Sequence, residues 1–499
     1  MINNQSLKQS NMKQVSNASL TKTIVIGLLL QLVPINSTTA QTKAEKIDQL
    51  MNTYSQYEQF NGSVLVAEHG KIIYEKGFGM ANMEWNLPNE VNTKFRLGSI
   101  TKQFTAVLTL KLVEQGKIKL DVPITTYLPD YPKSNGDKIT IHQLLTHTAG
   151  ISNYTSFPNF TKDLSRNPST PEAFVKTFAD LPLDFTPGEK FSYSNSGYFL
   201  LGYIIEKVSG KSYEDYLQEN ILTPLKMINS GYDHSDIILK NRASGYDKKG
   251  RNYSNTSYID MGIPYAAGSL YSTVDDLYLW DQALYTNQLL SPKSMDLLFT
   301  GYMPARNESY GYGWFIGEVS NGTNDKLKVT SHGGGINGFN TIISRIPADK
   351  NLVVILNNTG GTVLNEMTTS IQNILYDKPY DLPKKSLAAS LLEDISDDGL
   401  VIGLEKFKEN KKANNYALSE DEMNNIGYQF LQSEKVEEAV AVFKLNAEAF
   451  PKSGNAYDSL GEAYLKNGNK KLAIFNYKKS VELDPTNENG KKVLAEITK

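Results

Sequence analysis

Ser99 and Lys102, a serine and a lysine separated by two residues, are the first pair in this chain that could do chemistry together. The apolar spacing that follows them predicts a helix beginning at about Ser99. Residues i and i+3 share one face of a helix, so the lysine amine is expected to reach the serine hydroxyl. A serine hydroxyl becomes an effective nucleophile when a neighbouring base takes its proton. The pair therefore predicts a serine nucleophile with a lysine base, although Ser-x-x-Lys alone also occurs by chance.

A second polar segment offers a partner for this pair. Tyr193 and Asn195 lie in a polar loop that follows the Pro187-Gly188 turn. A tyrosine there can present its hydroxyl to the serine, and its phenolate, with a reference pKa of about 10, is a competent base beside a Lys102 cation. The Asn195 amide can hold a substrate carbonyl and the lysine amine. Tyr-x-Asn alone is equally consistent with a simple polar turn.

A glycine-rich stretch, residues 332–338, follows an expected strand over residues 327–330. Consecutive glycines allow a ligand to approach the backbone closely. Backbone N–H groups near Gly334 and Gly335 could complete an oxyanion hole with that of Ser99. A flexible hairpin loop is the alternative, and His332 alone does not distinguish a surface residue from a site residue.

Taken together and in this order, the three segments make residues 60–370 resemble the serine β-lactamase and penicillin-binding-protein superfamily, in its class C β-lactamase-related branch. The resemblance extends to residues 144–150, to the turn before the tyrosine loop and to residues 267–276. It implies an acylated serine, Ser99, with Lys102 and Tyr193 sharing the acid and base steps. It also implies that Asn195 positions substrate and that the N–H groups of Ser99 and Gly335 form the oxyanion hole.

One departure from that family affects the expected substrate. The third motif commonly begins with lysine, whereas this chain has His332, followed by Gly333 and Gly334. Histidine is mostly neutral at pH 7, so it attracts a β-lactam or peptide carboxylate more weakly than the charged lysine would. An esterase or a peptidase acting on D-residues is therefore favoured over a β-lactamase. A further histidine, His147, is expected to be structural.

The composition of the chain disfavours or excludes several kinds of partner and active site. The chain has 499 residues, a net charge of −3 and no cysteine. This charge does not favour a nucleic-acid partner, and the lack of cysteine excludes disulfides, thiolate metal sites and a cysteine nucleophile. There is no zinc-binding pattern in the sequence, so the chemistry is expected to need neither a metal nor another cofactor.

The N-terminus predicts export. Residues 1–40 combine early lysines, an apolar run over residues 24–35 and small residues before Gln41, as signal peptides do. The apolar run is shorter than the roughly 20 residues that a spanning helix needs. The mature protein is therefore expected in the periplasm or outside the cell, without a membrane span. An uncleaved membrane anchor is the alternative.

The helices and strands that the sequence predicts around the site indicate an α/β sandwich. A helix is expected over residues 43–56, and β-rich runs over residues 62–69 and 71–77 indicate a hairpin. Residues 139–150 read as a helix ending at glycine, and residues 153–257 as helices and loops. Two early strands and several late ones imply one antiparallel sheet closed by both ends of the domain, flanked by helices and carrying a helical insertion. The late strands and a closing helix are expected over residues 312–316, 327–330, 340–346, 352–356 and 367–376.

The C-terminal region contains an internal repeat. Six positions of matching chemical type recur at an offset of 34 residues, the period of the tetratricopeptide repeat. The expected domains are a hydrolase over residues 41–378, a linker and helical connector over residues 379–419, and repeats over residues 420–499. Residues 386–413 are expected to add a packing pair to the repeats. The repeats either bind a peptide or protein partner or act as a stabilising cap.

The sequence thus predicts an exported serine hydrolase that forms an acyl-enzyme at Ser99. Its substrate is expected to be an ester, an amide or a D-aminoacyl peptide, as for an esterase, a D-aminopeptidase or a DD-carboxypeptidase. A β-lactamase is one alternative. A non-catalytic scaffold that binds a partner through its repeats is the alternative from another class.

Overall fold

The computed structural model describes residues 41–249, 252–322 and 325–498. The predicted export signal, residues 1–40, lies outside these described residues. Among the described helices none combines the length and apolarity needed to cross a bilayer. The two regions described below are a sheet-containing region that runs to α11 and a helical tail that follows it.

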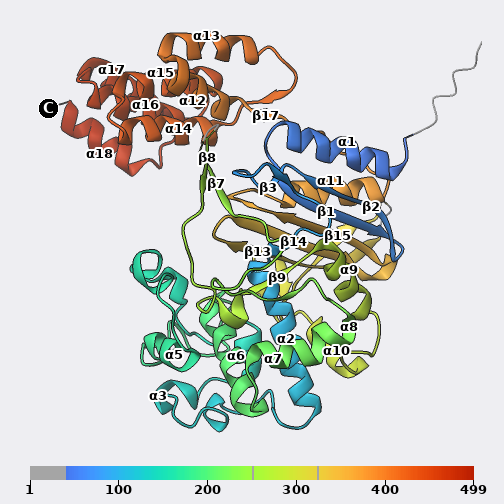
Figure 1. Cartoon of the computed structure of the whole chain (residues 1–499). Coiled ribbons are helices and arrows are strands. Elements are labelled where there is room, and N and C mark those ends of the chain that lie inside the picture. Colours follow the sequence, from blue (N-terminus) through green and yellow to red (C-terminus); the bar gives the residue numbers. More distant parts are fainter. Residues whose placement is uncertain (1–40, 250–251, 323–324, 499) are drawn as a thin grey trace, which may run out of the picture. The chain divides into compact units, whose positions relative to one another are not determined.

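An eight-stranded antiparallel sheet forms the centre of the first region (Figure 1). Strand β1 lies between β2, its hairpin partner, and β15, a strand almost 300 residues later in the chain. The predicted closure of one sheet by both ends of the domain is therefore confirmed. In spatial order the strands are β10 (Met303–Ala305), β11 (Glu308–Tyr310), β12 (Phe315–Ser320), β13 (Lys326–Ile336), β14 (Phe339–Ile346), β15 (Asn351–Asn357), β1 (Gly62–Glu68) and β2 (Lys71–Phe78).

Both faces of the sheet are covered. Successive strand residues point to opposite faces, and in β1 Val64 and Val66 belong to one buried cluster while Leu65 and Ala67 belong to another. The first cluster includes residues of α1 (Lys43–Gln56) and α11 (Asn365–Leu375), which lie on the same side of the sheet in Figure 1. The second cluster includes residues of most of the other helices of this region. This is the predicted α/β sandwich with a helical insertion.

Helix α2 (Thr101–Glu114) is the centre of the larger cluster. Residues on nearly all of its faces are buried, so it is a core helix rather than an amphipathic surface helix. Ser99 does not start this helix, as the apolar spacing suggested, but lies in a 3₁₀ turn, Gly98–Ile100, that leads into it. Gly98 adopts a left-handed conformation, with φ +55°. This conformation is readily available to glycine and bends the chain into the turn.

The predicted helix over residues 139–150 is wrong beyond its first half. Helix α4 spans only Ile141–Leu145 and begins with a capping box at Thr140. The chain then leaves the helix, and His147 and Gly150 both have positive φ. The insertion also contains α3 (Lys133–Gly136), α5 (Pro171–Ala179), α6 (Asn195–Ser209), α7 (Tyr213–Leu217), α8 (Thr223–Leu225), α9 (Val274–Ala283) and α10 (Pro292–Leu298).

The structure contains short strands that the sequence did not predict, and three of them, β6, β7 and β8, lie within residues 153–257, where it predicted helices and loops. They are held by a few hydrogen-bonded pairs each and are too short to show an alternating pattern. One small sheet joins strands on either side of the insertion and another includes a strand after β15. The short strands are β3 (Met80–Asn82), β4 (Leu87–Pro88), β5 (Phe95–Arg96), β6 (Gly231–Tyr232), β7 (Tyr246–Lys249), β8 (Asn252–Asn255), β9 (Leu270–Ser272) and β16 (Thr359–Gly360).

The C-terminal tail consists of helices with their own buried cluster. Two glycines at the repeat offset have the same packing role: a Cβ at Gly427 would lie 2.5 Å from the Phe443 ring, and one at Gly461 3.0 Å from the Tyr477 ring. The first helix of each pair therefore accepts an aromatic ring of the second. After β17 (Lys385–Ser386) the elements are α12 (Leu387–Asp398), α13 (Leu400–Asn410), β18 (Tyr416–Ala417), α14 (Glu420–Gln432), α15 (Val436–Ala449), α16 (Gly454–Lys466), α17 (Lys470–Leu483) and α18 (Glu488–Ile497).

The predicted extra packing pair is also present, because α12 and α13 contribute Leu391 and Phe407 to the cluster of the tail.

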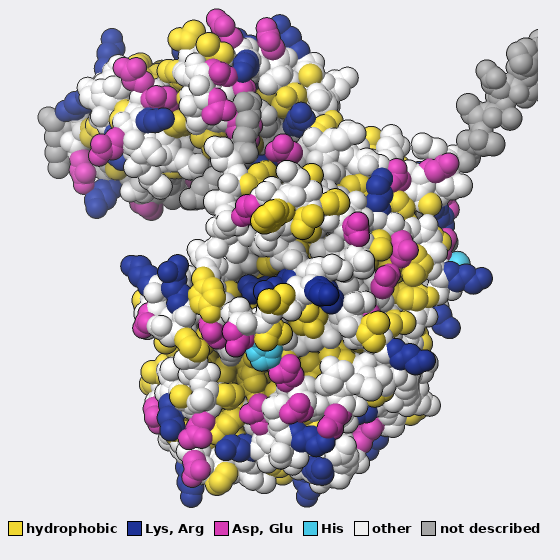
Figure 2. Space-filling view, in the orientation of Figure 1, with side chains coloured by type: hydrophobic (Ala, Val, Ile, Leu, Met, Phe, Trp, Pro, Cys, Tyr) yellow, Lys and Arg dark blue, Asp and Glu magenta, His cyan; other side chains and the backbone are white. Residues whose placement is uncertain are grey.

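On the face shown in Figure 2, acidic and basic side chains are interspersed, in keeping with the small net charge.

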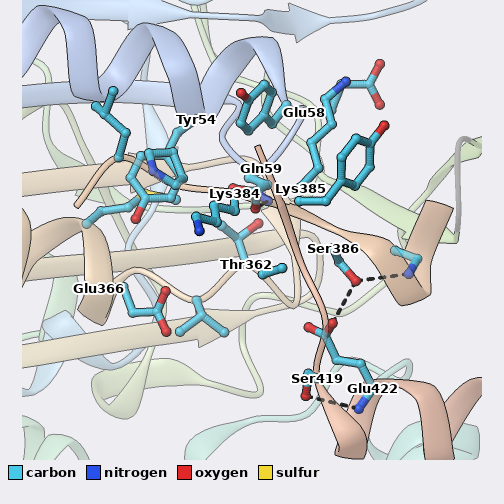
Figure 3. A pocket seen from close by; sticks show the side chains of 18 of the residues that line it. Tyr54, Glu58, Gln59, Thr362, Glu366, Lys384, Lys385, Ser386, Ser419 and Glu422 are labelled. Atoms are coloured by element: carbon cyan, nitrogen blue, oxygen red, sulfur yellow. Dashed lines mark hydrogen bonds between the residues drawn. The ribbon is translucent and has the colours of Figure 1, made fainter. Parts of the chain in front are cut away.

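A cavity of about 1670 Å³ is lined by the end of α1, by residues 359–373 and by the start of the tail. Several of its polar side chains are already paired, as Ser386 is with Glu422 (Figure 3). No residue of the predicted site lines this cavity.

Candidate active site

The first turn of α2 brings Lys102 to Ser99. The Lys102 Nζ lies 3.1 Å from the Ser99 Oγ, within hydrogen-bond distance. It also donates to the Asn195 Oδ1 at 2.8 Å and to the Ala267 backbone carbonyl at 2.8 Å. Asn195 is the first residue of α6, and Ala267 precedes β9, so three separate segments converge on one amine.

The environment of Lys102 favours a neutral amine. The side chain is fully buried, and burial lowers the pKa of Lys102 well below its ordinary value of 10.5. Its three hydrogen-bond partners are uncharged. A neutral amine has two N–H groups and one lone pair. The Asn195 Oδ1 and the Ala267 carbonyl are acceptors only, so they take the two N–H groups. The lone pair is then left to accept the proton of the Ser99 hydroxyl.

Tyr193 also lies next to the lysine. The Lys102 Nζ is 4.9 Å from the centre of the Tyr193 ring. Burial raises the pKa of Tyr193 above its ordinary value of 10, and its hydrogen bond with Ser99 offsets part of this rise. The expectation of a phenolate held by a lysine cation is therefore not met. This environment favours the phenol, which can donate a proton.

The glycine-rich third motif belongs to strand β13 rather than to a loop after it. The strand continues to Ile336, and Gly334 and Gly335 pair with residues of β14. The expected end of the strand near residue 330 is therefore wrong. A Cβ at Gly98 would lie 2.9 Å from the Gly335 nitrogen, so the turn that carries Ser99 and this strand are in close backbone contact. This contact places the backbone of Ser99 near that of Gly335, as an oxyanion hole requires.

A glycine is needed at position 334 because the strand there passes close to the backbone of Leu97, just before the turn that carries Ser99. A Cβ at Gly334 would collide with the Leu97 carbonyl oxygen and the Thr341 hydroxyl, whereas one at Gly333 meets its nearest atom at 3.6 Å. We expect Gly334→Ala to lower stability by about 1–3 kcal/mol through overpacking and to reduce turnover strongly, because the strand must move away from Ser99. Gly333→Ala is the control and should change both little. Thermal unfolding and hydrolysis of a p-nitrophenyl ester measure the two effects, and equal behaviour of the two variants would contradict this account.

His332, for which the sequence left a surface and a site position open, is a buried residue beside the site. Its side chain is only 2 % exposed, and its two ring nitrogens lie within hydrogen-bond distance of the Tyr310 hydroxyl and the Gly333 carbonyl. Burial, together with the nearby Lys102, lowers its pKa to about 3, although the Gly333 carbonyl acts in the opposite direction. His332 is thus a neutral residue in the wall of the site rather than a side chain with a free donor for substrate.

Two further residues neighbour the site, and one of them, Tyr310, could not be predicted from the sequence. His147, expected to be structural, holds the backbone on both sides of Tyr193: its carbonyl accepts from the Ser192 N–H and its Nδ1 accepts from the Ser194 N–H. Its ring lies 4.2 Å from that of Tyr193, centre to centre. Tyr310, at the end of β11, contacts both His147 and His332. The only signal for His147 was its position in the 144–150 segment, and no motif indicated Tyr310.

The side chains at this site can support a serine acyl transfer. Across the parts of the chain that the structure describes, no cluster of histidine, aspartate and glutamate side chains is arranged to hold a metal ion. Ser99, Lys102, Tyr193, Asn195 and the backbone at Gly335 are the residues brought together. They supply a nucleophile, a base, a proton donor, an amide and N–H groups.

Comparison with known proteins identifies the family. The family described as Beta-lactamase matches residues 44–375, and Tetratricopeptide repeat matches residues 454–487. A penicillin-binding protein of Bacillus subtilis (strain 168) is 31% identical over 366 residues, which are 69% of this chain and 79% of that protein.

Two solved structures extend the comparison. The octameric penicillin-binding protein homologue from Pyrococcus abyssi is 30% identical, covers 70% of this chain and 81% of its own, and has a TM-score of 0.60. A D-stereospecific amidohydrolase from Streptomyces sp. is 27% identical, covers 62% of this chain and 94% of its own, and has a TM-score of 0.53. The chain therefore belongs to the β-lactamase family of serine hydrolases and carries a tetratricopeptide repeat near its C-terminus.

Proposed function

We propose that the protein is an exported hydrolase of the class C β-lactamase-related branch that forms an acyl-enzyme at Ser99 and acts on amides or esters of D-configured acyl groups. The observation that carries this proposal is the buried Lys102 amine. Its two other partners, the Asn195 Oδ1 and the Ala267 carbonyl, take its N–H groups and leave its lone pair for the Ser99 hydroxyl proton. Export is proposed from the signal-like residues 1–40.

In the acylation step, the Ser99 Oγ bonds to the substrate carbonyl carbon and its proton passes to the Lys102 Nζ. The carbonyl oxygen becomes an oxyanion that the backbone N–H groups of Ser99 and Gly335 stabilise. The bond to the leaving group then breaks, and the Tyr193 phenol donates the proton that the leaving group needs. Lys102 returns its proton to Tyr193, which restores both groups. Water then attacks the acyl-enzyme, and the acid product leaves with Ser99 regenerated.

The substrate class rests on the third motif and on the relatives. A neutral His332 supplies no fixed cation for a β-lactam carboxylate, which disfavours an efficient β-lactamase. The Streptomyces relative is named as a D-stereospecific amidohydrolase, and other relatives are named as penicillin-binding proteins. The first of these names supports a D-configured acyl group.

Paired enantiomers test the substrate class. We expect the mature protein to hydrolyse D-alanine p-nitroanilide with a kcat/KM at least about tenfold above that for L-alanine p-nitroanilide, the scale on which one well-fitted pocket contact discriminates. A matched pair of D- and L-alanine methyl esters extends the measurement to esters. Preference for the L-enantiomers would refute the D-configured substrate. Rapid turnover of a penicillin would favour the β-lactamase alternative, and no hydrolysis of any ester, amide or penicillin would favour a non-catalytic scaffold.

A further inference from the structure

A buried chain of side-chain hydrogen bonds connects the tyrosine loop to the third-motif strand. It runs from the Ser194 N–H to the His147 Nδ1 at 3.2 Å and from the His147 Nε2 to the Tyr310 hydroxyl at 3.2 Å. From there it continues to the His332 Nε2 at 3.1 Å, and the His332 Nδ1 meets the Gly333 carbonyl at 2.6 Å. His147, Tyr310 and His332 are each at most 2 % exposed.

The two ends of this chain determine the tautomers of its two histidines. A backbone N–H can only donate, so the His147 Nδ1 is unprotonated and its Nε2–H donates to Tyr310. A backbone carbonyl can only accept, so the His332 Nδ1 carries a proton and its Nε2 accepts from the Tyr310 hydroxyl. Each contact then has one donor and one acceptor, with both imidazoles neutral. Burial lowers the pKa of both histidines, which agrees with this assignment.

Each end of the chain lies next to a group that the proposed reaction uses. At one end, His147 holds the residues on both sides of Tyr193. At the other end, His332 is three residues before Gly335 in β13. Phe191 and Phe315 pack against the middle, with ring centres 5.5 Å from Tyr310 and 5.3 Å from His332 respectively. In such an apolar setting a hydrogen bond is strong, and a lost partner leaves a costly unpaired group.

We propose that Tyr310 is a positioning residue, which through His147 and His332 holds the Tyr193 proton donor and the Gly335 oxyanion-hole strand in one arrangement. This inference rests on the proposed function, since it concerns the placement of groups that act on the Ser99 acyl-enzyme. Tyr310 itself does not touch the reacting atoms. Its hydroxyl is the single atom that receives from one imidazole and donates to the other.

The first test removes only that hydroxyl. We expect Tyr310→Phe to lower kcat for a p-nitrophenyl ester by about 100-fold, the loss expected from a small misplacement of catalytic groups, while KM changes less than about threefold. Tyr312→Phe is the matched control. The Tyr312 hydroxyl is also hydrogen-bonded to a histidine, since it lies 2.7 Å from the His142 Nδ1, but this bond is not part of the chain described above. If both variants lose equal stability and Tyr310→Phe keeps its kcat, the proposal is wrong.

A double substitution separates positioning from general loss of packing. His147→Asn keeps an acceptor where Nδ1 was, and so keeps the Ser194 contact, but cannot reach Tyr310. Residues that act as one unit are not additive. We therefore expect His147→Asn combined with Tyr310→Phe to lose no more kcat than the larger single loss. Additive losses would show that the two residues act independently and would overturn the proposal.

A spectroscopic test does not depend on turnover. The ¹⁵N chemical shifts of the imidazoles in the intact protein are expected to show the Nε2–H tautomer for His147 and the Nδ1–H tautomer for His332 at neutral pH. Tyr310→Phe should shift the Nε2 signal of His332, which loses its donor. If the tautomers are as expected but Ser99 is never acylated, the proposed function fails and the chain of bonds stands. The opposite tautomer at His332 would overturn the chain itself.

Discussion

Replacing Ser99 with alanine is expected to lower kcat for ester and amide substrates by at least about 10⁴-fold, because loss of a serine nucleophile removes the covalent route altogether. The fold should persist, because Ser99 lies in a short turn and the substitution removes only its hydroxyl. Circular dichroism and thermal unfolding of Ser99→Ala should therefore match those of the wild type.

The control for this variant is Ser209→Ala, which removes a serine hydroxyl from the end of α6, where its hydrogen bond with Lys211 is exposed. Wild-type turnover in this control shows that loss of a hydroxyl alone does not reduce activity. Activity in Ser99→Ala within about tenfold of the wild type would reject Ser99 as the nucleophile.

The second large effect is expected at Lys102. Lys102→Met keeps the length of the side chain but removes the amine, and kcat/KM should fall by about 10⁴-fold because nucleophile and base act as a unit. The pH dependence of the wild type identifies the base. Burial lowers the pKa of Lys102, so the active, unprotonated amine persists to a lower pH than an exposed lysine would allow. Activity is therefore lost as the pH falls through this lowered pKa.

The alkaline side of the profile distinguishes the two candidate bases. Because burial raises the pKa of Tyr193, the phenol persists above pH 10. A Lys102 base therefore predicts a kcat/KM that stays constant from above the lowered pKa of Lys102 up to about pH 10. A Tyr193 phenolate base would instead give a rate that still climbs at pH 10. Tyr193→Phe supplies the control, since an amide needs a proton on its leaving group and a p-nitrophenyl ester does not. The variant should lose far more activity on the amide.

The parts of the site that follow from local geometry could be predicted from the sequence. The spacing of Ser99 and Lys102 and the apolar pattern after them lead directly to adjacent side chains at the start of a buried helix. The hairpin of β1 and β2 and the 34-residue repeat are likewise local patterns. The α/β sandwich could also be predicted, because strands at the two ends of a domain are expected to pair in one sheet.

The remaining parts depend on contacts between distant segments. Lys102 has a lowered pKa because tertiary packing buries it, and one of its acceptors is a backbone carbonyl, at Ala267, which no motif encodes. Glycines are poor strand formers, so the expected strand stopped before Gly334, but close approach of Leu97 requires glycine there within the strand. Similarly, the positive φ of His147 ends the helix that apolar periodicity extended to residue 150.

The mass of the intact protein after acid quenching during hydrolysis of N-acetyl-D-alanine p-nitrophenyl ester tests the central claim most directly. With an activated ester, acylation is fast and the acyl-enzyme accumulates. We predict a mass increase of one acyl group on the wild type, located on Ser99 by peptide mapping, and none on Ser99→Ala. Steady turnover by the wild type with no adduct, or the same adduct on Ser99→Ala, would contradict an acyl-enzyme at Ser99.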